Sequence, residues 1–248
     1  MIVWAILAVA FGGILKGATG AGVPIVAAPA ITMLYDVQTA VAVLVITNLF
    51  SNIWQAWAHR RDALPPRFLA WFAGAGMVGV VAGTLLLVWL PAEALALLVA
   101  LAVLGYLALR LLRAGFTLAR EVADRIAGPV GFLGGLLQGS TGLSAPAVLT
   151  FLNAMRLPRT AFIGTISVFF VTMSAMQVPT LIAVGVLTPE RIALGFGVLA
   201  IATVTMPLGA WLGRHLSPRL FDALMLALLA AIAVKILIES ALSLAGGG

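Results

Sequence analysis

Two glycine-rich segments of the chain carry the residues best suited to binding an anion. Residues 12–24 read GGILKGATGAGVP, and residues 134–146 repeat the pattern as GGLLQGSTGLSAP. Glycine lets a backbone approach a ligand closely, and a helix that restarts after such a break presents N–H groups with no intrahelical acceptor. These N–H groups, at the positive end of the helix dipole, attract oxyanions, and we expect the restarting helices to begin near Thr19 and Thr141. The hydroxyls of Thr19, Ser140, Thr141 and Ser144 are expected to add donors. The repeated segments therefore predict a binding site for a small anion.

One charged side chain lies inside these segments. Lys16 stands between Leu15 and Gly17 in an otherwise uncharged apolar run, and its counterpart in the second segment is Gln138. A charge in such surroundings is costly and is usually functional, so Lys16 is expected to contact a substrate. The alternative is that Lys16 caps the last carbonyls of the preceding helix or extends to the membrane surface.

The helix that follows the first segment adds amide groups. Asn48, Asn52 and Gln55 are spaced so that they share one helix face, which would place them beside the break. The side chains of these residues could instead only form hydrogen bonds between helices. The corresponding region of the second half contains Thr165, Ser167, Thr172, Ser174 and Gln177. The predicted substrate-binding residues are Lys16, Gly17, Thr19, Gly20, Gly22, Asn48, Asn52, Gln138, Gly139, Ser140, Thr141, Gly142 and Ser144.

The composition places these residues in a membrane protein. Hydrophobic residues make up 63% of the 248 residues and charged residues only 9%, against about 25% charged in soluble domains. The net charge of +6 comes from basic residues in short connections, which indicates membrane orientation and no nucleic-acid partner. Cysteine is absent, which excludes disulfides and thiol chemistry. We expect no metal, no cofactor and no enzymatic activity, because acids and histidines lie near the ends of the apolar runs.

Each half of the chain contains three uncharged runs long enough to cross a bilayer. These runs are Val37–Ala58, Phe68–Leu90, Ala94–Leu109, Thr160–Leu187, Ile192–Gly213 and Ala223–Val234. Each set of three follows one of the broken segments, Met1–Leu34 or Ile126–Asn153. We therefore predict a first repeat over residues 1–113, a cytoplasmic linker over 114–125 and a second repeat over 126–248. Lys235 and Glu239 are expected to form a structural pair in the last helix.

The arginines decide how the broken segments run. If each segment enters the membrane and leaves on the same side, every arginine except Arg191 lies on one side, as the positive-inside rule prefers. The predicted fold is then an all-α polytopic membrane protein with two inverted-topology repeats. Each repeat is a broken re-entrant helical hairpin plus three transmembrane helices. Both termini are predicted to be extracytoplasmic.

The motifs also resemble a known family. The segment Gly17–Pro24, its echo Gly139–Pro146 and the compact duplicated hydrophobic chain are similar to the sulfite exporter TauE/SafE family of membrane permeases. The resemblance spans the whole chain, although the second motif departs from the first in its Leu-Ser-Ala-Pro ending. It implies transport of sulfite, organosulfonates or related small sulfur-containing anions across a bacterial inner membrane. A homodimer is possible.

Two other functions fit the same residues. A passive anion channel could use the same helix ends, and the carried anion could be another small organic anion. No nucleotide-binding P-loop is present, so a carrier would draw its energy from an ion gradient, from the substrate gradient or from a partner.

Overall fold

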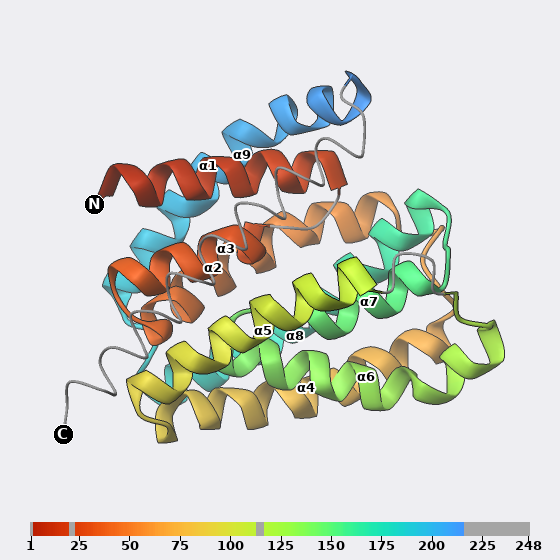
Figure 1. Ribbon diagram of the computed structural model, residues 1–248, viewed down its shortest axis with the longest axis horizontal. Helices are drawn as coiled ribbons and strands as arrows, with labels where there is room; N and C mark the ends of the chain where they lie inside the picture. Colours follow the sequence, from red (N-terminus) through yellow and green to blue (C-terminus); the bar gives the residue numbers. More distant parts are fainter. Residues whose placement is uncertain (1, 20–22, 113–116, 216–248) are drawn as a thin grey trace.

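The computed structural model describes residues 2–19, 23–112 and 117–215. These residues form nine helices and no strand (Figure 1). The helices are α1 (Ile2–Thr19), α2 (Val23–Leu34), α3 (Val37–Ala58), α4 (Pro66–Trp89), α5 (Ala92–Leu112), α6 (Arg120–Thr141), α7 (Ala145–Ala154), α8 (Arg159–Ala183) and α9 (Pro189–His215). The all-helical fold predicted for a polytopic membrane protein is confirmed.

Four helices are long and apolar enough to cross a bilayer, and each was predicted as a span. They are α3, α4, α8 and most of α9, while α5 is a shorter apolar helix over Ala92–Ala108. The observed bounds of α3 agree with the predicted run because Asp36 caps it, accepting a hydrogen bond from the Thr39 amide at 2.7 Å. The predicted span Ala223–Val234 and the Lys235–Glu239 pair lie outside the described residues.

Both broken segments are helical hairpins. We predicted from the sequence that their second arms begin near Thr19 and Thr141, and this is wrong, because those residues end α1 and α6. The physical reason is visible at Gly142, which adopts the left-handed conformation (φ 72°) and donates its N–H to the Gln138 carbonyl. This is the usual way for glycine to end a helix. The second arms start at α2 and α7.

The two hairpins point in opposite directions. In Figure 1, α1 runs from left to right and α2 returns, whereas α6 runs from right to left and α7 returns. The start of α1 and the end of α2 thus lie toward one end of the bundle, and the start of α6 and the end of α7 toward the other. This arrangement is expected of re-entrant hairpins in inverted repeats. α6 begins at Arg120, so the later part of the predicted linker, residues 114–125, is helical.

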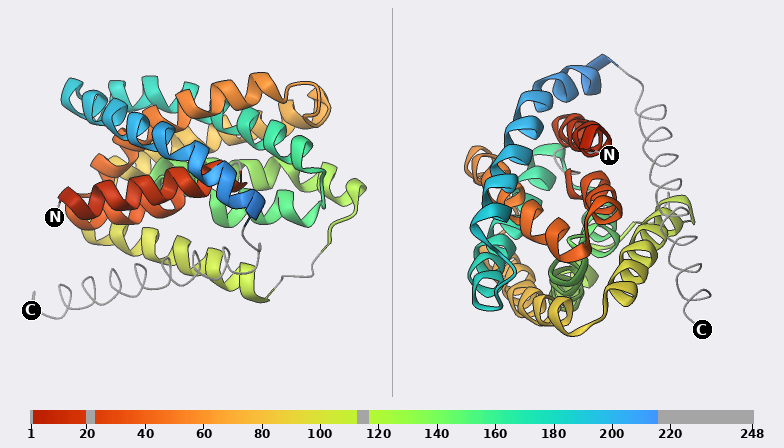
Figure 2. Two further views of the ribbon diagram at one scale, coloured as in Figure 1. Left: turned by 90° about the horizontal axis from the view of Figure 1, so that it is seen from above. Right: turned by 90° about the vertical axis from the view of Figure 1, so that its left-hand side faces the viewer.

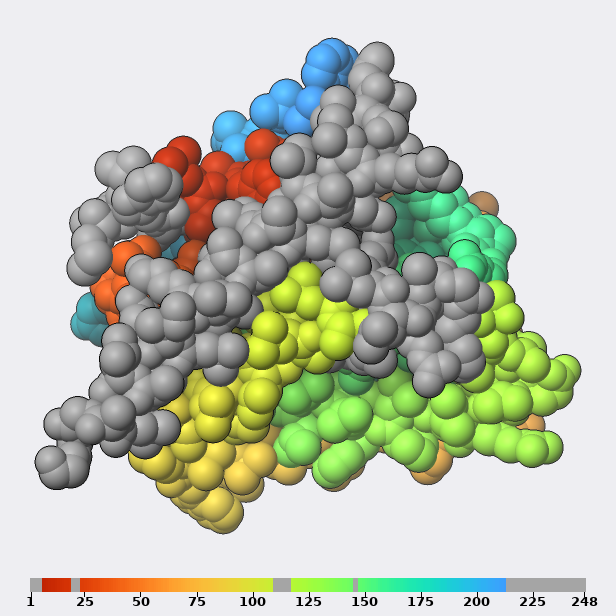
Figure 3. Space-filling view, viewed as in Figure 1, coloured from red at the N-terminus to blue at the C-terminus, as the bar shows by residue number. Residues whose placement is uncertain are grey.

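The first arm of each hairpin packs against a helix of the other half. The most extensive helix contacts are those of α4 with α6 and of α1 with α9, and α3 packs on α8 between them. Figure 2 shows α1 beside α9 in the end-on view. In Figure 3, α1 and α9 form one edge of the visible face, and α5 and α6 the opposite edge. The two halves therefore interlock through their hairpins.

Glycines at corresponding positions make these two contacts possible. A Cβ on Gly13 would overlap with Ala202 and Thr205 of α9, and one on Gly135 would overlap with Gly76 of α4. The same correspondence holds for two further pairs of contacts. Gly17 meets Met206 while Gly139 meets Val80, and Gly209 meets Ile14 while Gly83 meets Leu136. Equivalent crossings in both halves support the predicted repeat, since small residues let membrane helices approach closely.

Reporter tags test the predicted membrane orientation. We expect a tag at Met1 to report the extracytoplasmic side and a tag within residues 113–116 to report the cytoplasm. The reason is that the connections α3–α4 and α7–α8 and the start of α6, which carry most arginines, lie at one end of the bundle, opposite Arg191. The measurement is a pair of fusions with reporters active on only one side. A cytoplasmic Met1 would contradict the re-entrant arrangement.

Candidate substrate-binding site

Lys16 is buried in the protein interior and joins two predicted site residues. It lies in the last turn of α1 with 2% of its surface exposed, and its Nζ donates to Asn52 Oδ1 of α3 at 3.0 Å. Asn52 Nδ2 in turn donates to the backbone oxygen of Asn48 at 2.7 Å and to Asn48 Oδ1 at 2.8 Å. The structure therefore brings Lys16, Asn52 and Asn48 together in one hydrogen-bonded chain, as the shared face of the two asparagines predicted.

Helix capping, the alternative role for Lys16, is performed by another residue. Arg159, at the start of α8, donates from a guanidinium nitrogen to the Ala18 carbonyl at 3.1 Å. Lys16 instead points to the asparagine pair and stays buried, so it does not reach the surface. Arg159 was missed as a neighbour of the first break because its sequence position suggested only an exposed connection.

The second half places a neutral amide group at the corresponding position. Gln138 of α6 is buried, and its backbone oxygen accepts a hydrogen bond from Gln177 Nε2 of α8 at 3.4 Å. Ser174 lies on the same face of α8 as Gln177, because the two are three residues apart, and both are fully buried. Ser174 and Gln177 were noted in the sequence but were not placed in the predicted site. Their three-residue spacing was the signal that could have included them.

Four buried polar atoms of these residues have no hydrogen-bond partner among the residues that the structure describes. They are Asn48 Nδ2, Gln138 Oε1, Ser174 Oγ and Gln177 Oε1. Buried polar atoms in native proteins nearly always have a partner in the protein or in ordered water. An interior that holds several unpaired atoms together with a lysine is therefore suited to a polar ligand or to waters that such a ligand replaces.

The second break is closely packed and its hydroxyls are already used. Ser140 donates to the Leu136 carbonyl at 2.8 Å and Thr141 to the Leu137 carbonyl at 2.7 Å. The expectation that these hydroxyls are free to donate to an anion is therefore wrong in this conformation, because each returns to the preceding helical turn. Ser144, also buried, makes no side-chain cap on α7.

Few backbone donors remain at the start of α7. Pro146 has no N–H, and the amides of Ala147 and Val148 already donate to the Ser144 carbonyl. Within the described part of the chain, the amide of Ser144, just before α7, has no hydrogen-bond partner and is available to a ligand. In the first break, Thr19 is the last residue of α1, and only its backbone is described. Gly20 and Gly22 lie outside the described residues.

The glycines of the two motifs have different roles. Gly17 and Gly139 face the backbones of α9 and α4, so close helix packing accounts for them. Gly142 instead needs its positive φ, and a Cβ there would lie 3.6 Å from Val41 and 3.8 Å from Ala28, an ordinary contact distance. Because Val41 and Ala28 belong to α3 and α2, the second break faces the interior and meets the first hairpin.

Replacing Gly142 with valine is expected to abolish transport while the protein still folds. Valine disfavours positive φ by about 1 to 2 kcal/mol or more, so the α6–α7 turn should shift and displace Gln138, whose carbonyl accepts the Gly142 amide. Thermal unfolding and anion uptake are the measurements. Gly185→Val is the matched control, because Gly185 has φ 73° with nothing within 4 Å of its Cβ. Equal loss of uptake in both variants would remove any special role of the break.

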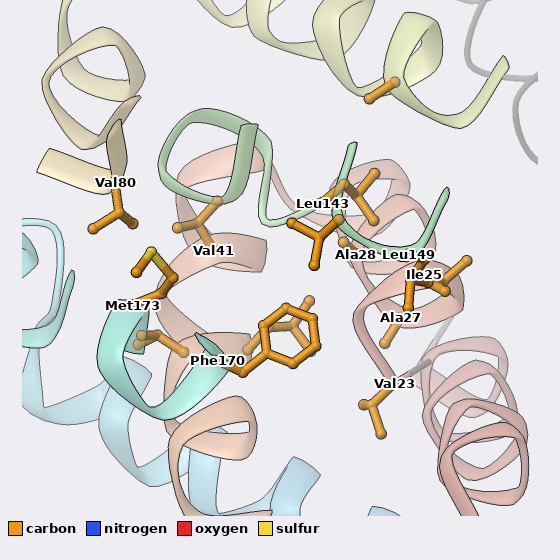
Figure 4. Close-up of a cluster of buried hydrophobic side chains, with 14 of the residues drawn as sticks. Val23, Ile25, Ala27, Ala28, Val41, Val80, Leu143, Leu149, Phe170 and Met173 are labelled. Carbon is orange, nitrogen blue, oxygen red and sulfur yellow. The ribbon is translucent and has the colours of Figure 1, made fainter. Parts of the chain in front are cut away.

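Apolar side chains fill the space between the hairpins. Figure 4 shows Val41, Leu143 and Phe170 around one space, with Val23 of α2 on its far side. All four belong to one buried cluster. Hydrophobic groups of the described residues thus occupy the space between the hairpins in this conformation.

Two cavities in the described part of the protein have linings that do not include Lys16. One, of about 690 Å³, is lined mainly by apolar residues of α1, α2, α3 and α9, with Glu190 at its edge. The other, of about 800 Å³, lies where α4 and α6 begin and is lined by Arg67, Arg120 and Arg125. The described residues contain no group of three or more histidine or acidic side chains that could hold a metal.

Comparisons with known proteins agree with the resemblance noted in the sequence. The family described as sulfite exporter TauE/SafE matches residues 5–236, which is nearly the whole chain. No curated protein and no solved structure was found to match it. The match includes both broken hairpins, Lys16 with its asparagine partners, and the four long apolar helices. The chain is an integral membrane protein and belongs to the sulfite exporter TauE/SafE family.

Proposed function

We propose that this protein is a secondary transporter of small sulfur-containing oxyanions, such as sulfite or an organosulfonate, that works by alternating access in a bacterial inner membrane. The anion binds between the two hairpins. Lys16, Asn48 and Asn52 contact it from the first half, and Gln138, Ser174 and Gln177 from the second. The amide of Ser144 adds a donor just before α7.

The observation that carries this proposal is the burial of Lys16 with no acidic partner in the part of the chain that the structure describes. Its hydrogen-bond partner is the neutral Asn52, and α2, α3 and the part of α9 from Ile192 to Trp211 contain no acidic side chain. A lysine in such a place is costly unless another group neutralises it. An oxyanion brings both the negative charge and the acceptor oxygens that the three ammonium N–H groups require. The family match supports a sulfur-containing oxyanion in particular.

Alternating access is supported by the apolar side chains between the hairpins and by the interlocked halves. A passive channel needs a continuous wet path, whereas apolar side chains such as Phe170 and Leu143 occupy the space between the hairpins. Equivalent glycine crossings join α1 to α9 and α4 to α6, so each hairpin can move as a unit with a helix of the other half. Gating by such a movement would expose Lys16 to each side in turn.

A binding screen tests the substrate class. The purified protein is heated with sulfite, sulfate, thiosulfate, sulfoacetate or taurine, and with carboxylates of matched size. We expect one or more of the sulfur oxyanions to raise the unfolding temperature, because a ligand that binds only the folded state stabilises it. Stronger stabilisation by carboxylates would replace this proposal with a carrier of another organic anion. No stabilisation by any anion would contradict the proposed site.

A further inference from the structure

The protonation state of the Lys16 side chain in the empty protein determines how this site can bind an anion. An ammonium has three N–H groups to donate and needs a negative partner when it is buried. Here the nitrogen makes one hydrogen bond to the described residues, at 3.0 Å, and its acceptor is the neutral oxygen of Asn52. One acceptor suits a neutral amine, while the buried ammonium would remain largely unpaired.

The charged groups near Lys16 also disfavour a positive charge on its side chain. α2 and α3 contain no titratable side chain within their bounds, and the charged residues of α9 lie near its ends, at Glu190, Arg191, Arg214 and His215. Arg159 is the charged residue that contacts α1 close to Lys16, through the Ala18 carbonyl, and it is positive. The described helices around Lys16 therefore provide no carboxylate to hold it as an ammonium.

We infer that Lys16 is a neutral amine in the empty transporter and takes up a proton when the anion binds, so that the anion and a proton cross the membrane together. This inference rests on the proposed function. The lone pair of Nζ accepts a proton from water on the side to which the site is open, and no other bond forms or breaks. When the anion leaves on the opposite side, the same N–H bond breaks and the proton returns to water.

The coupling follows from charge balance in a medium that solvates ions poorly. A bound anion without the proton would be a buried negative charge, and a protonated Lys16 without the anion would be a buried positive one. The pair together is neutral for a monovalent anion, and it is hydrogen-bonded as well. Each partner therefore favours the entry of the other. This makes the proton gradient a source of energy for a protein that has no nucleotide-binding loop.

The lysine content of the chain allows a direct test. Lys16 and Lys235 are the two lysines, so Lys235→Arg protein labelled with ¹³C at lysine Cε gives a single signal from Lys16. The chemical shift of Cε distinguishes amine from ammonium, and the same sample unfolded in denaturant provides the ammonium reference. We expect the amine shift in empty protein at neutral pH and the ammonium shift when sulfite is added. An ammonium in the empty protein, or an amine in both states, would overturn the inference.

A second variant isolates the proton from the anion. Lys16→Arg keeps the positive charge, but arginine does not lose its proton in proteins. The ratio of sulfite affinity in the wild type to that in Lys16→Arg removes the contribution of sulfite's own titration. We expect this ratio to fall as the pH rises, because only the wild type must first gain a proton. A ratio independent of pH would overturn the coupling, whereas failure of sulfite to bind either protein would contradict the proposed function itself.

Discussion

Replacing Lys16 with glutamine is expected to weaken sulfite binding by roughly 5- to 150-fold. The change removes a charge-assisted hydrogen bond, which contributes about 1 to 3 kcal/mol, and it makes the first half resemble the second, where Gln138 stands. Glutamine can still bond to Asn52, so the polar chain to Asn48 should persist. The measurement is sulfite affinity by thermal shift or calorimetry, together with uptake into liposomes.

The stability of this variant separates a binding role from a structural one. Lys16 is buried and has no acidic partner among the described residues, so Lys16→Gln should leave the unfolding temperature of the empty protein unchanged or raise it. Arg191→Gln is the matched charge control, because Arg191 lies at the beginning of α9 and donates to the Val186 carbonyl at 2.8 Å. Its sulfite affinity should equal that of the wild type. Equal losses in the two variants, or no loss in either, would place Lys16 outside the site.

Alanine at Gly135 is expected to prevent the protein from folding properly. The added methyl group would overlap with the backbone of Gly76 and Val80 in α4, which is a rigid part of the chain and cannot move aside as a side-chain tip could. Overpacking of a close contact costs about 1 to 3 kcal/mol or more, and α4–α6 is among the most extensive contacts of the fold. The measurements are yield of monodisperse protein and unfolding temperature.

The equivalent glycine of the first half gives a second test, and two glycines without close neighbours give the controls. Gly13→Ala should have a similar effect, since Gly13 meets α9 as Gly135 meets α4. Gly74→Ala and Gly105→Ala should be tolerated or slightly stabilising, because nothing lies within 4 Å of either Cβ and alanine favours the helix by about 1 kcal/mol. A folded, active Gly135→Ala protein would show that the α4–α6 crossing is looser than described.

The long helices could be predicted because their signals are local. Uncharged runs bounded by charged or proline residues locate α3, α4, α8 and α9, and the repeated glycine motif locates both breaks. The exact restart of each hairpin could not be predicted. In the second hairpin it depends on the left-handed conformation of Gly142, which several glycines in the motif could have adopted.

The candidate site was predicted only in part because its contacts join distant helices. Helical spacing placed Asn48 and Asn52 on one face, but no local pattern indicates that Lys16 reaches Asn52 across two helices. The same limit explains why Arg159, a partner of Ala18, and Gln177, a partner of Gln138, were not assigned. Short glycine motifs can serve either ligand binding or helix packing. The packing role of Gly17 and Gly139 became evident only from the α9 and α4 backbones that lie beside them.

Counterflow of labelled sulfite in proteoliposomes tests the central claim most directly. Vesicles containing the purified protein are loaded with unlabelled sulfite and diluted into a trace of labelled sulfite. We predict a transient accumulation of label inside the vesicles that saturates with internal sulfite and is strongly reduced by Lys16→Gln. The reason is that a carrier that has released unlabelled sulfite outside binds labelled sulfite there and carries it back inside. A flux that rises linearly with sulfite and gives no accumulation would show a passive channel, and no flux above protein-free vesicles would contradict sulfite transport.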